Sequence, residues 1–227
     1  MCGRGDQSLT WEQINTLLRI DGSSPRSNLE PRYNIAPTTD VKIVRQVDGK
    51  RLLQSARWDL IPAWWKKPLK EKKFSTFNAR VETLRETASY RTPWRKGQRC
   101  IAPMNFYEWK RPRTKGEGPF HIYPKHDPAL LLAGVWDEWK DPDTGKAVLT
   151  FSIVTVPANE LIEPLHDRMP AILSKQQADD WFNAPPEEAF LMLKPCPSEW
   201  LSLTRVSPYV NNSRNQGPDC IKPEEVQ

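Results

Sequence analysis

The stretches LLLAGVWDEW, residues 130–139, and AVLTFSIVTV, residues 147–156, decide the fold of this chain. The first contains two tryptophans, and the second is dense in valine, isoleucine, threonine and phenylalanine, which favour strands. Shorter strand-like runs precede them: RCIAP at 99–103, FYEWK at 106–110 and FHIYP at 120–124. The middle of the chain is therefore expected to form a sheet.

A hairpin is predicted nearer the N-terminus. The runs DVKIVRQV (40–47) and RLLQSARW (51–58) flank the pair Asp48-Gly49. Two β-rich runs around an Asp-Gly pair are a strong hairpin signal.

Helical patterns lie mainly near the two ends of the chain. Residues 10–20 (TWEQINTLLRI) are amphipathic, and Thr10 with Gln13 forms a capping-box pattern. Residues 174–183 (SKQQADDWFN) begin with a similar Ser-x-x-Gln cap. A second helix is expected at 186–194, and a short one at 79–89.

Two segments are predicted to be loops. Residues 21–39 are polar and rich in proline, and residues 60–78 contain the basic run KKPLKEKK, which is expected to be exposed. Strands in the middle and helices at the ends predict an α+β fold with a curved antiparallel sheet. The length suits a single domain over residues 1–227, with 208–227 as a mostly irregular tail.

Composition narrows the function classes. The chain has 33 Lys+Arg against 28 Asp+Glu, a net charge of +5, which favours a polyanionic partner without proving one. Its four cysteines include no CxxC pair and its three histidines show no ligand spacing, so we expect no metal and no cofactor.

The N-terminus has no apolar signal region, and no stretch approaches the about 20 apolar residues of a membrane span. We expect a cytoplasmic, nucleoid-associated monomer with reduced thiols.

Cys2 is the first residue with distinctive chemistry. Removal of Met1 would place an α-amine and a thiol on one residue, with ordinary pKa values of about 7.7–8.0 and about 8.5. Such a 1,2-aminothiol reacts with an aldehyde first through the amine, as a Schiff base, and then through the thiol, which closes a thiazolidine ring. Taken alone, Cys2 is more simply interpreted as a chance cysteine on a frayed terminus.

Three further positions carry ionisable or polar groups in suggestive settings. Asn78, in FNAR, can orient an amine or a sugar hydroxyl, or can simply cap a helix. Glu108, in FYEW, lies on the same strand face as Phe106 and is either an acid–base group with a raised pKa or an exposed carboxylate. His166, in PLHDRMP, lies on a loop stiffened by two prolines and is either an acid–base group or structural. His121 and His126 are expected to be surface or strand residues, and Cys100 to be buried and inert.

Together these residues resemble the SOS-response-associated peptidase family, SRAP. The matching strings cover nearly the whole chain in family order: MCGR at 1–4, NIAPT at 34–38, WDLIP at 58–62, FNARVET at 77–83, RCIAP at 99–103, FYEW at 106–109, AGVW at 133–136, FSIVTVPAN at 151–159, HDRMP at 166–170 and VNN at 210–212.

The resemblance implies a fold and an activity. It implies a curved, barrel-like antiparallel sheet and a basic groove for single-stranded DNA. It also implies a thiazolidine crosslink between Cys2 and the ring-opened aldehyde of an abasic site, after autocatalytic or aminopeptidase removal of Met1. In this scheme Asn78 positions the amine and sugar, Glu108 aids proton transfer, and His166 assists ring opening. The candidate DNA contacts are Arg4, Arg80, Arg168, Trp64 and Trp65.

The chain departs from the family pattern in three places. An aromatic residue usually follows MCGR, whereas this chain has Gly5 and then Asp6; WDLIP has Asp59 where glycine is usual; and Met104-Asn105 replaces an acidic-glycine pair before FYEW. These changes are expected to loosen the N-terminal turn and to add acidic groups near the groove.

Two other functions compete with crosslinking. An N-terminal-nucleophile cysteine peptidase or amidohydrolase would use the same Cys2 catalytically. A passive DNA-binding module would bind in a salt-sensitive way without any bond that survives denaturation.

Overall fold

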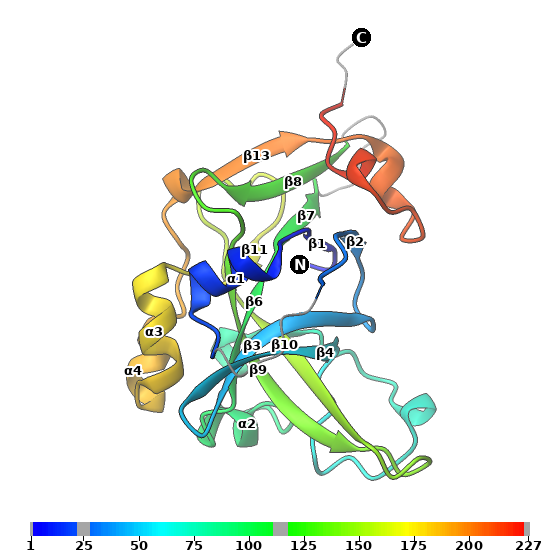
Figure 1. Ribbon diagram of the computed structural model, residues 1–227, viewed down its shortest axis with the longest axis vertical. Helices are drawn as coiled ribbons and strands as arrows, with labels where there is room; N and C mark the ends of the chain where they lie inside the picture. Colours follow the sequence, from blue (N-terminus) through cyan, green and yellow to red (C-terminus); the bar gives the residue numbers. More distant parts are fainter. Residues whose placement is uncertain (1, 22–27, 111–117, 225–227) are drawn as a thin grey trace.

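The computed structural model describes residues 2–21, 28–110 and 118–224 (Figure 1). Its longest element is the antiparallel hairpin of β9 (Leu131–Lys140) and β10 (Ala147–Pro157). Gly134 lies in this hairpin opposite Ile153. A Cβ atom at Gly134 would lie 2.7 Å from the Ser152 carbonyl oxygen and 2.9 Å from Cys100 Sγ, so the strands approach this closely only because the residue is glycine.

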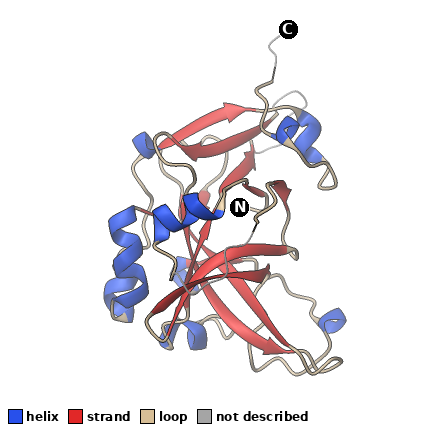
Figure 2. Cartoon of the chain, in the orientation of Figure 1, coloured by secondary structure: helices blue, strands red, loops and turns tan. Residues whose placement is uncertain are grey.

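Five strands close into a barrel around this hairpin. Strand β10 pairs with β4 (Lys50–Trp58), β4 with β3 (Asp40–Val47), β3 with β6 (Arg99–Pro103), and β6 with β9, which returns to β10. All of these pairings are antiparallel except β10–β4. The β-rich runs of the sequence are therefore strands, and the α+β prediction is confirmed (Figure 2).

The predicted hairpin at Asp48-Gly49 is confirmed. Strands β3 and β4 pair from Asp40↔Arg57 to Val47↔Lys50. Asp48 has a φ of 49° and Gly49 a φ of 75°. A two-residue turn with positive φ at both positions matches the right-handed twist of its strands, and Asp-Gly adopts it at low cost.

A second sheet brings the N-terminal segment to the centre of the molecule (Figure 1). Its strand order is β13-β8-β7-β1-β2. The strands are β1 (Gly5–Gln7), β2 (Arg32–Ile35), β7 (Asn105–Trp109), β8 (Pro119–Pro124) and β13 (Leu201–Arg205). The prediction that 21–39 is all loop is wrong at β2, because hydrogen bonds to β1 order a segment whose own sequence reads as polar and irregular.

The predicted short helix at 79–89 is also wrong. Residues Asn78–Arg80 form β5, which runs parallel to β10 at Ile153–Thr155, and a single 3-10 turn, Val81–Thr83, follows. The hydrogen bonds along β10 outweigh the weak local helix preference. On its other side, β10 pairs with β11 (Arg168–Pro170), and β12 (Ile172–Leu173) pairs with β9.

Helices cover the outside of the sheets (Figure 2). They are α1 (Trp11–Leu18), α2 (Arg91–Arg95), α3 (Lys175–Asn183) and α4 (Pro186–Leu191). The predicted capping boxes at Thr10 and Ser174 are both present. None of the helices in the described ranges is long and apolar enough to cross a membrane.

The segment 60–78 is only partly the exposed loop that its lysines suggest. Leu60 and Ile61 are fully buried, and the side chain of Lys72 is only 2% exposed. Lys72 Nζ lies 2.8 Å from a carboxylate oxygen of Asp59, which is buried as well. A short 3-10 turn at Leu69–Glu71 lies within the segment.

Apart from β13, the described chain after α4 has little regular structure, but it is well anchored. It contains three further 3-10 turns, at Ser198–Trp200, Pro208–Asn211 and Pro218–Cys220. Val206 and Pro223 form an isolated bridge. Val210 and Cys220 are fully buried and pack in a small cluster with Tyr107.

Candidate functional site

Cys2 lies in the hydrophobic core and has no exposed surface. Its backbone carbonyl accepts a hydrogen bond of 2.8 Å from Asn78 Nδ2. Two residues later, the Arg4 carbonyl accepts a 2.9 Å hydrogen bond from the Tyr107 N–H, and Gly5 pairs with Ile35 and Phe106. The N-terminal segment is therefore fixed on both sides rather than frayed.

Asn78 is itself held by a second hydrogen bond. Tyr90 Oη donates to the Asn78 carbonyl at 3.0 Å. Burial raises the pKa of Tyr90 to about 12, so this hydroxyl stays protonated and keeps donating at neutral pH. Asn78 sits in β5, and its side chain bridges β5 to the N-terminal segment. The structure thus brings together Asn78 and Cys2, two residues that the sequence separates by 76 positions.

Glu108 is buried in β7 and acts on the Cys2 thiol. Burial raises the pKa of that thiol well above its ordinary value, and the negative charge of Glu108 raises it further. The thiol is therefore protonated at neutral pH. The burial of Glu108 agrees with the acid–base interpretation of FYEW and not with a solvated carboxylate.

His166 is buried at the end of a turn that immediately precedes β11. Its backbone N–H donates to the Ile162 carbonyl at 3.0 Å. Its Nδ1 lies 3.0 Å from the Arg168 backbone N and 2.7 Å from Asp167 Oδ1. Because β11 and β5 both pair with β10, at Thr155, the segments carrying His166 and Asn78 reach the same strand from opposite sides.

Two of the arginines expected to contact DNA are engaged inside the protein. Arg168 is buried, and its guanidinium forks onto both carboxylate oxygens of Glu82 and donates to the Thr155 carbonyl. The hydrogen bond from Arg168 lowers the pKa of Glu82. Arg4 Nη1 donates to Asn34 Oδ1 at 2.7 Å and to the Val210 carbonyl at 2.8 Å.

Arg80 and the tryptophan pair lie differently. Arg80 is exposed, and Trp64 is 49% exposed. Trp65 is half-buried. The centroid of its ring lies 6.2 Å from that of Trp64 and 5.3 Å from that of Phe74. Phe74 is 37% exposed. An exposed indole beside lysines offers a flat surface on which an unpaired base can stack.

Asn34 is a site residue that the sequence did not single out. It is buried, and its Nδ2 lies within hydrogen-bonding distance of the carbonyls of Val210, Asn212 and Asn215, at 3.2, 2.9 and 2.9 Å. Through Arg4, Asn34 connects the C-terminal segment to the segment that carries Cys2. The only sequence indication of this contact is that both NIAPT and VNN contain asparagine. Nothing in the sequence indicates that the two segments lie together in the fold.

Comparison with known proteins identifies the family. The sequence profile described as "SOS response associated peptidase (SRAP)" matches residues 1–213. The chain belongs to the SRAP family. Among its SRAP relatives, "Abasic site processing protein YoqW" of Bacillus subtilis (strain 168) is 34% identical, over 98% of this chain and 99% of the relative. "Abasic site processing protein HMCES" of Gallus gallus is 35% identical, over 86% of this chain and 67% of the relative.

A solved structure shares this fold. A protein from Bacteroides thetaiotaomicron aligns with a TM-score of 0.85 and 28% sequence identity, over 99% of this chain and 100% of that one.

The acidic departures from the SRAP pattern are paired inside the protein. Asp6 and His121 are both buried, with Oδ2 and Nε2 2.6 Å apart, and Asp6 lies in β1 rather than in a loosened turn. His121 was predicted only as a surface or strand residue; it lies in β8. Asp59 is held by Lys72 and accepts a hydrogen bond from the Thr76 N–H. Neither acid therefore offers an open charge to DNA.

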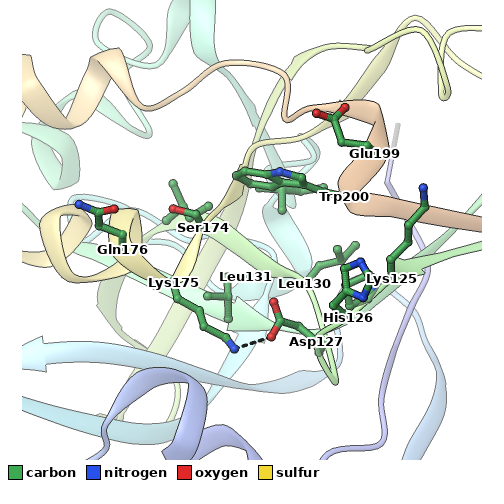
Figure 3. Close-up of a pocket in the computed structure, with 14 residues that line it drawn as sticks. Lys125, His126, Asp127, Leu130, Leu131, Ser174, Lys175, Gln176, Glu199 and Trp200 are labelled. Carbon is green, nitrogen blue, oxygen red and sulfur yellow. Dashed lines mark ion pairs between the residues drawn. The ribbon is translucent and has the colours of Figure 1, made fainter.

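A cavity of about 680 Å³ lies away from these residues, between the end of β8 and the start of α3 (Figure 3). Its wall includes Leu130, Leu131 and Trp200, and Lys175 and Asp127 form an ion pair at its rim. None of Cys2, Asn78, Glu108 and His166 lines it. This cavity is therefore separate from the four candidate residues, of which Asn78 and Glu108 both act on Cys2.

Proposed function

We propose that this chain processes abasic sites by forming a covalent crosslink between Cys2 and abasic single-stranded DNA. The observation that carries the proposal is a Cys2 fixed at its carbonyl by Asn78 and influenced by the buried carboxylate of Glu108. The names of two SRAP relatives, which describe abasic site processing, support the same substrate.

The reaction needs the α-amine of Cys2, so Met1, which lies outside the described residues, must first be removed. The amine adds to the C1′ aldehyde of the opened abasic sugar, and the adduct loses water to give an imine. The thiol sulfur then adds to the imine carbon, the S–H proton passes to the nitrogen, and a thiazolidine ring closes. No oxidant or reductant is consumed.

The protonated state of the thiol favours this order of steps. A cysteine peptidase or amidohydrolase attacks its substrate as a thiolate, which requires a lowered pKa. In this chain burial and Glu108 raise the pKa of the Cys2 thiol. An amine that attacks first, followed by a thiol already held within ring-closing distance, has no need of a stable thiolate.

Glu108 and His166 are proposed to move the protons. Opening the closed abasic sugar removes a proton from the C1′ hydroxyl and delivers one to the ring oxygen. A buried carboxylate and an imidazole suit that exchange, and a positioned acid–base group typically contributes about 10²–10⁴-fold in rate. Arg80 and Trp64 are the proposed DNA contacts, since both are exposed, while Arg4 and Arg168 are proposed to act by holding the site together.

The experiment is intact-mass analysis of the purified protein with and without abasic single-stranded DNA. We expect a mature protein that begins at Cys2 and a heat-stable adduct in one-to-one ratio. Cys2→Ala should give an imine that borohydride traps, little stable adduct and more strand cleavage by β-elimination. Cys196→Ala, which removes another buried thiol, is the matched control and should crosslink normally.

Two results would contradict the proposal. A stable, unreduced adduct from Cys2→Ala at the wild-type level would exclude the thiazolidine. Catalytic turnover of a peptide or amide, with no DNA adduct, would favour the N-terminal-nucleophile peptidase instead.

A further inference from the structure

The imidazole of His166 has two neighbours that compete for one of its nitrogens. Nδ1 lies 3.0 Å from the backbone N of Arg168 and 2.7 Å from Oδ1 of Asp167. A ring nitrogen holds either a proton or a lone pair in the plane of the ring, and not both. With a lone pair, Nδ1 accepts the Arg168 N–H; with a proton, it donates to Asp167.

Whether Nδ1 carries the proton decides whether Nε2 can act as a base. In a neutral ring, a proton on Nδ1 leaves Nε2 with the lone pair, so Nε2 is a base. A proton on Nε2 makes that nitrogen a donor instead. Nε2 is buried, whereas the Asp167 side chain is 83% exposed, so Asp167 acts on the solvent side of the ring and Nε2 faces the interior.

The two neighbours are closely balanced. The contact with Asp167 is shorter and charge-assisted, which strengthens it, although water around the exposed carboxylate weakens it. The Arg168 N–H is part of a buried contact, so leaving it without an acceptor has a cost. Since Arg168 is held by Glu82 and by β11, and His166 by its bond to Ile162, the ring cannot easily turn to satisfy both.

We propose that Asp167 is a positioning residue that sets the tautomer of His166. The carboxylate keeps the proton on Nδ1, so that Nε2 is ready to accept a proton. Without Asp167, Nδ1 accepts the Arg168 N–H, and one proton is lost to water from Nδ1 while another is taken up from water at Nε2. The net charge of the ring is unchanged, but the base becomes a donor.

The kinetic consequence of this inference rests on the proposed function. Opening the abasic sugar, or freeing the Cys2 amine of its proton, requires a proton acceptor. A neutral His166 with its lone pair on Nε2 is suited to that role, and the other tautomer is not.

The first test reads the tautomer without DNA. Protein labelled with 15N at histidine has three imidazoles, and nitrogen shifts distinguish protonated from unprotonated ring nitrogens. At a pH where His166 is neutral, we expect its proton on Nδ1 in the wild type and on Nε2 in Asp167→Ala. His121, whose Nε2 faces Asp6, is an internal reference and should not change. An unchanged His166 tautomer in a folded Asp167→Ala protein overturns the inference.

The second test separates chemistry from DNA binding. The control is Glu163→Ala, which removes an exposed carboxylate from the same turn. Both variants lose one negative charge and should bind single-stranded DNA at least as tightly as the wild type. Only Asp167→Ala should lower the maximal crosslinking rate, by about 10- to 100-fold, within the range of a positioned acid–base group.

The outcomes distinguish the two proposals. Equal rate losses in both variants, or none in Asp167→Ala, would remove Asp167 from the mechanism. A tautomer that moves as expected in a protein that forms no DNA adduct would leave the structural inference standing and overturn the proposed function.

Discussion

Single hydrogen bonds decide how well the reactive end of this chain is held. Cys2 depends on Asn78, and Asn78 depends in turn on the hydroxyl of Tyr90, which contacts neither Cys2 nor DNA in the proposed reaction. The sequence offered FNAR and HDRMP as candidate motifs, and HDRMP contains Asp167, but it gave no reason to connect FNAR to Tyr90 or to expect Asp167 to contact the His166 ring. Such supporting residues are found only through the folded geometry, because their own residue types are common in unrelated roles.

Tyr90→Phe tests this dependence. The variant keeps the buried ring and removes the bond to the Asn78 carbonyl together with the contact to Ser152, so we expect the free energy of unfolding to fall by about 0.5–1.5 kcal/mol for each hydrogen bond lost. We also expect slower crosslinking at saturating DNA, because Asn78 is less well fixed. Urea unfolding and single-turnover adduct formation measure the two effects. A crosslinking rate equal to the wild type would mean that β5 alone positions Asn78.

Strands and turns show where local sequence suffices and where it fails. The Asp48-Gly49 hairpin and the capping boxes at Thr10 and Ser174 were predictable, because each depends on residues a few positions apart. Strand β5 was not, because its hydrogen bonds come from Ile153–Thr155, some 75 positions later in the chain. The same holds for β2, whose polar sequence becomes a strand only beside β1.

The burial of the reactive groups was predicted only in part. FYEW is a strand, as predicted, and Glu108 is buried in it, while His166 is buried further along the chain. The internal pairing of Arg168 with Glu82, and of Asp6 with His121, was not predictable, because an isolated arginine or aspartate reads as a surface residue.

Strand β1 makes a close fit that can be tested at Gly5. A Cβ atom at Gly5 would clash with Met104 Cε and lie 2.7 Å from the Asn105 carbonyl oxygen. Gly5→Ala should therefore displace β1, destabilise the protein by about 1–3 kcal/mol as overpacking usually does, and slow crosslinking by moving Cys2.

A second substitution, at Met104, tests whether the clash with this side chain is the cause of the destabilisation. Met104 is fully buried, so Met104→Ala alone also destabilises the protein, but the double variant should lose less stability than the sum of the two single losses, because the side-chain clash is removed while the backbone contact at Asn105 remains. Unfolding free energies of the two single variants and the double variant form the cycle. Strict additivity would show that Met104 is not what constrains Gly5.

At the scale of the whole molecule, buried acids link stability to alkaline pH. Burial raises the pKa of the thiols of Cys2 and Cys100 well above their ordinary value, raises that of Tyr90 from 10.0 to about 12, and raises that of Tyr107. These groups are neutral in the folded protein. Above about pH 9, the unfolded chain releases protons that the folded protein retains, so folding is favoured less.

We therefore expect a free energy of unfolding that is insensitive to these four groups below about pH 9 and falls as the pH rises beyond it. Urea unfolding curves between neutral pH and about pH 10.5 measure the trend. In Tyr90→Phe the free energy of unfolding should fall less steeply with pH, because the variant lacks one of the groups whose pKa is raised. A stability that rises over this range would contradict the burial of these side chains.

The bonds between Asn34 and the segment 210–215 also have a consequence for protein synthesis. A ribosome makes Cys2 and β2 early, but the carbonyls that Asn34 binds, and β13 at the edge of the same sheet, emerge much later. Domains generally fold as units, so the sheet that carries β1 cannot be complete on a nascent chain. The aminothiol would then be exposed to cellular aldehydes during translation, before any DNA is bound. In the proposed function, retention of Met1 until the C-terminal segment docks would keep the α-amine blocked during translation.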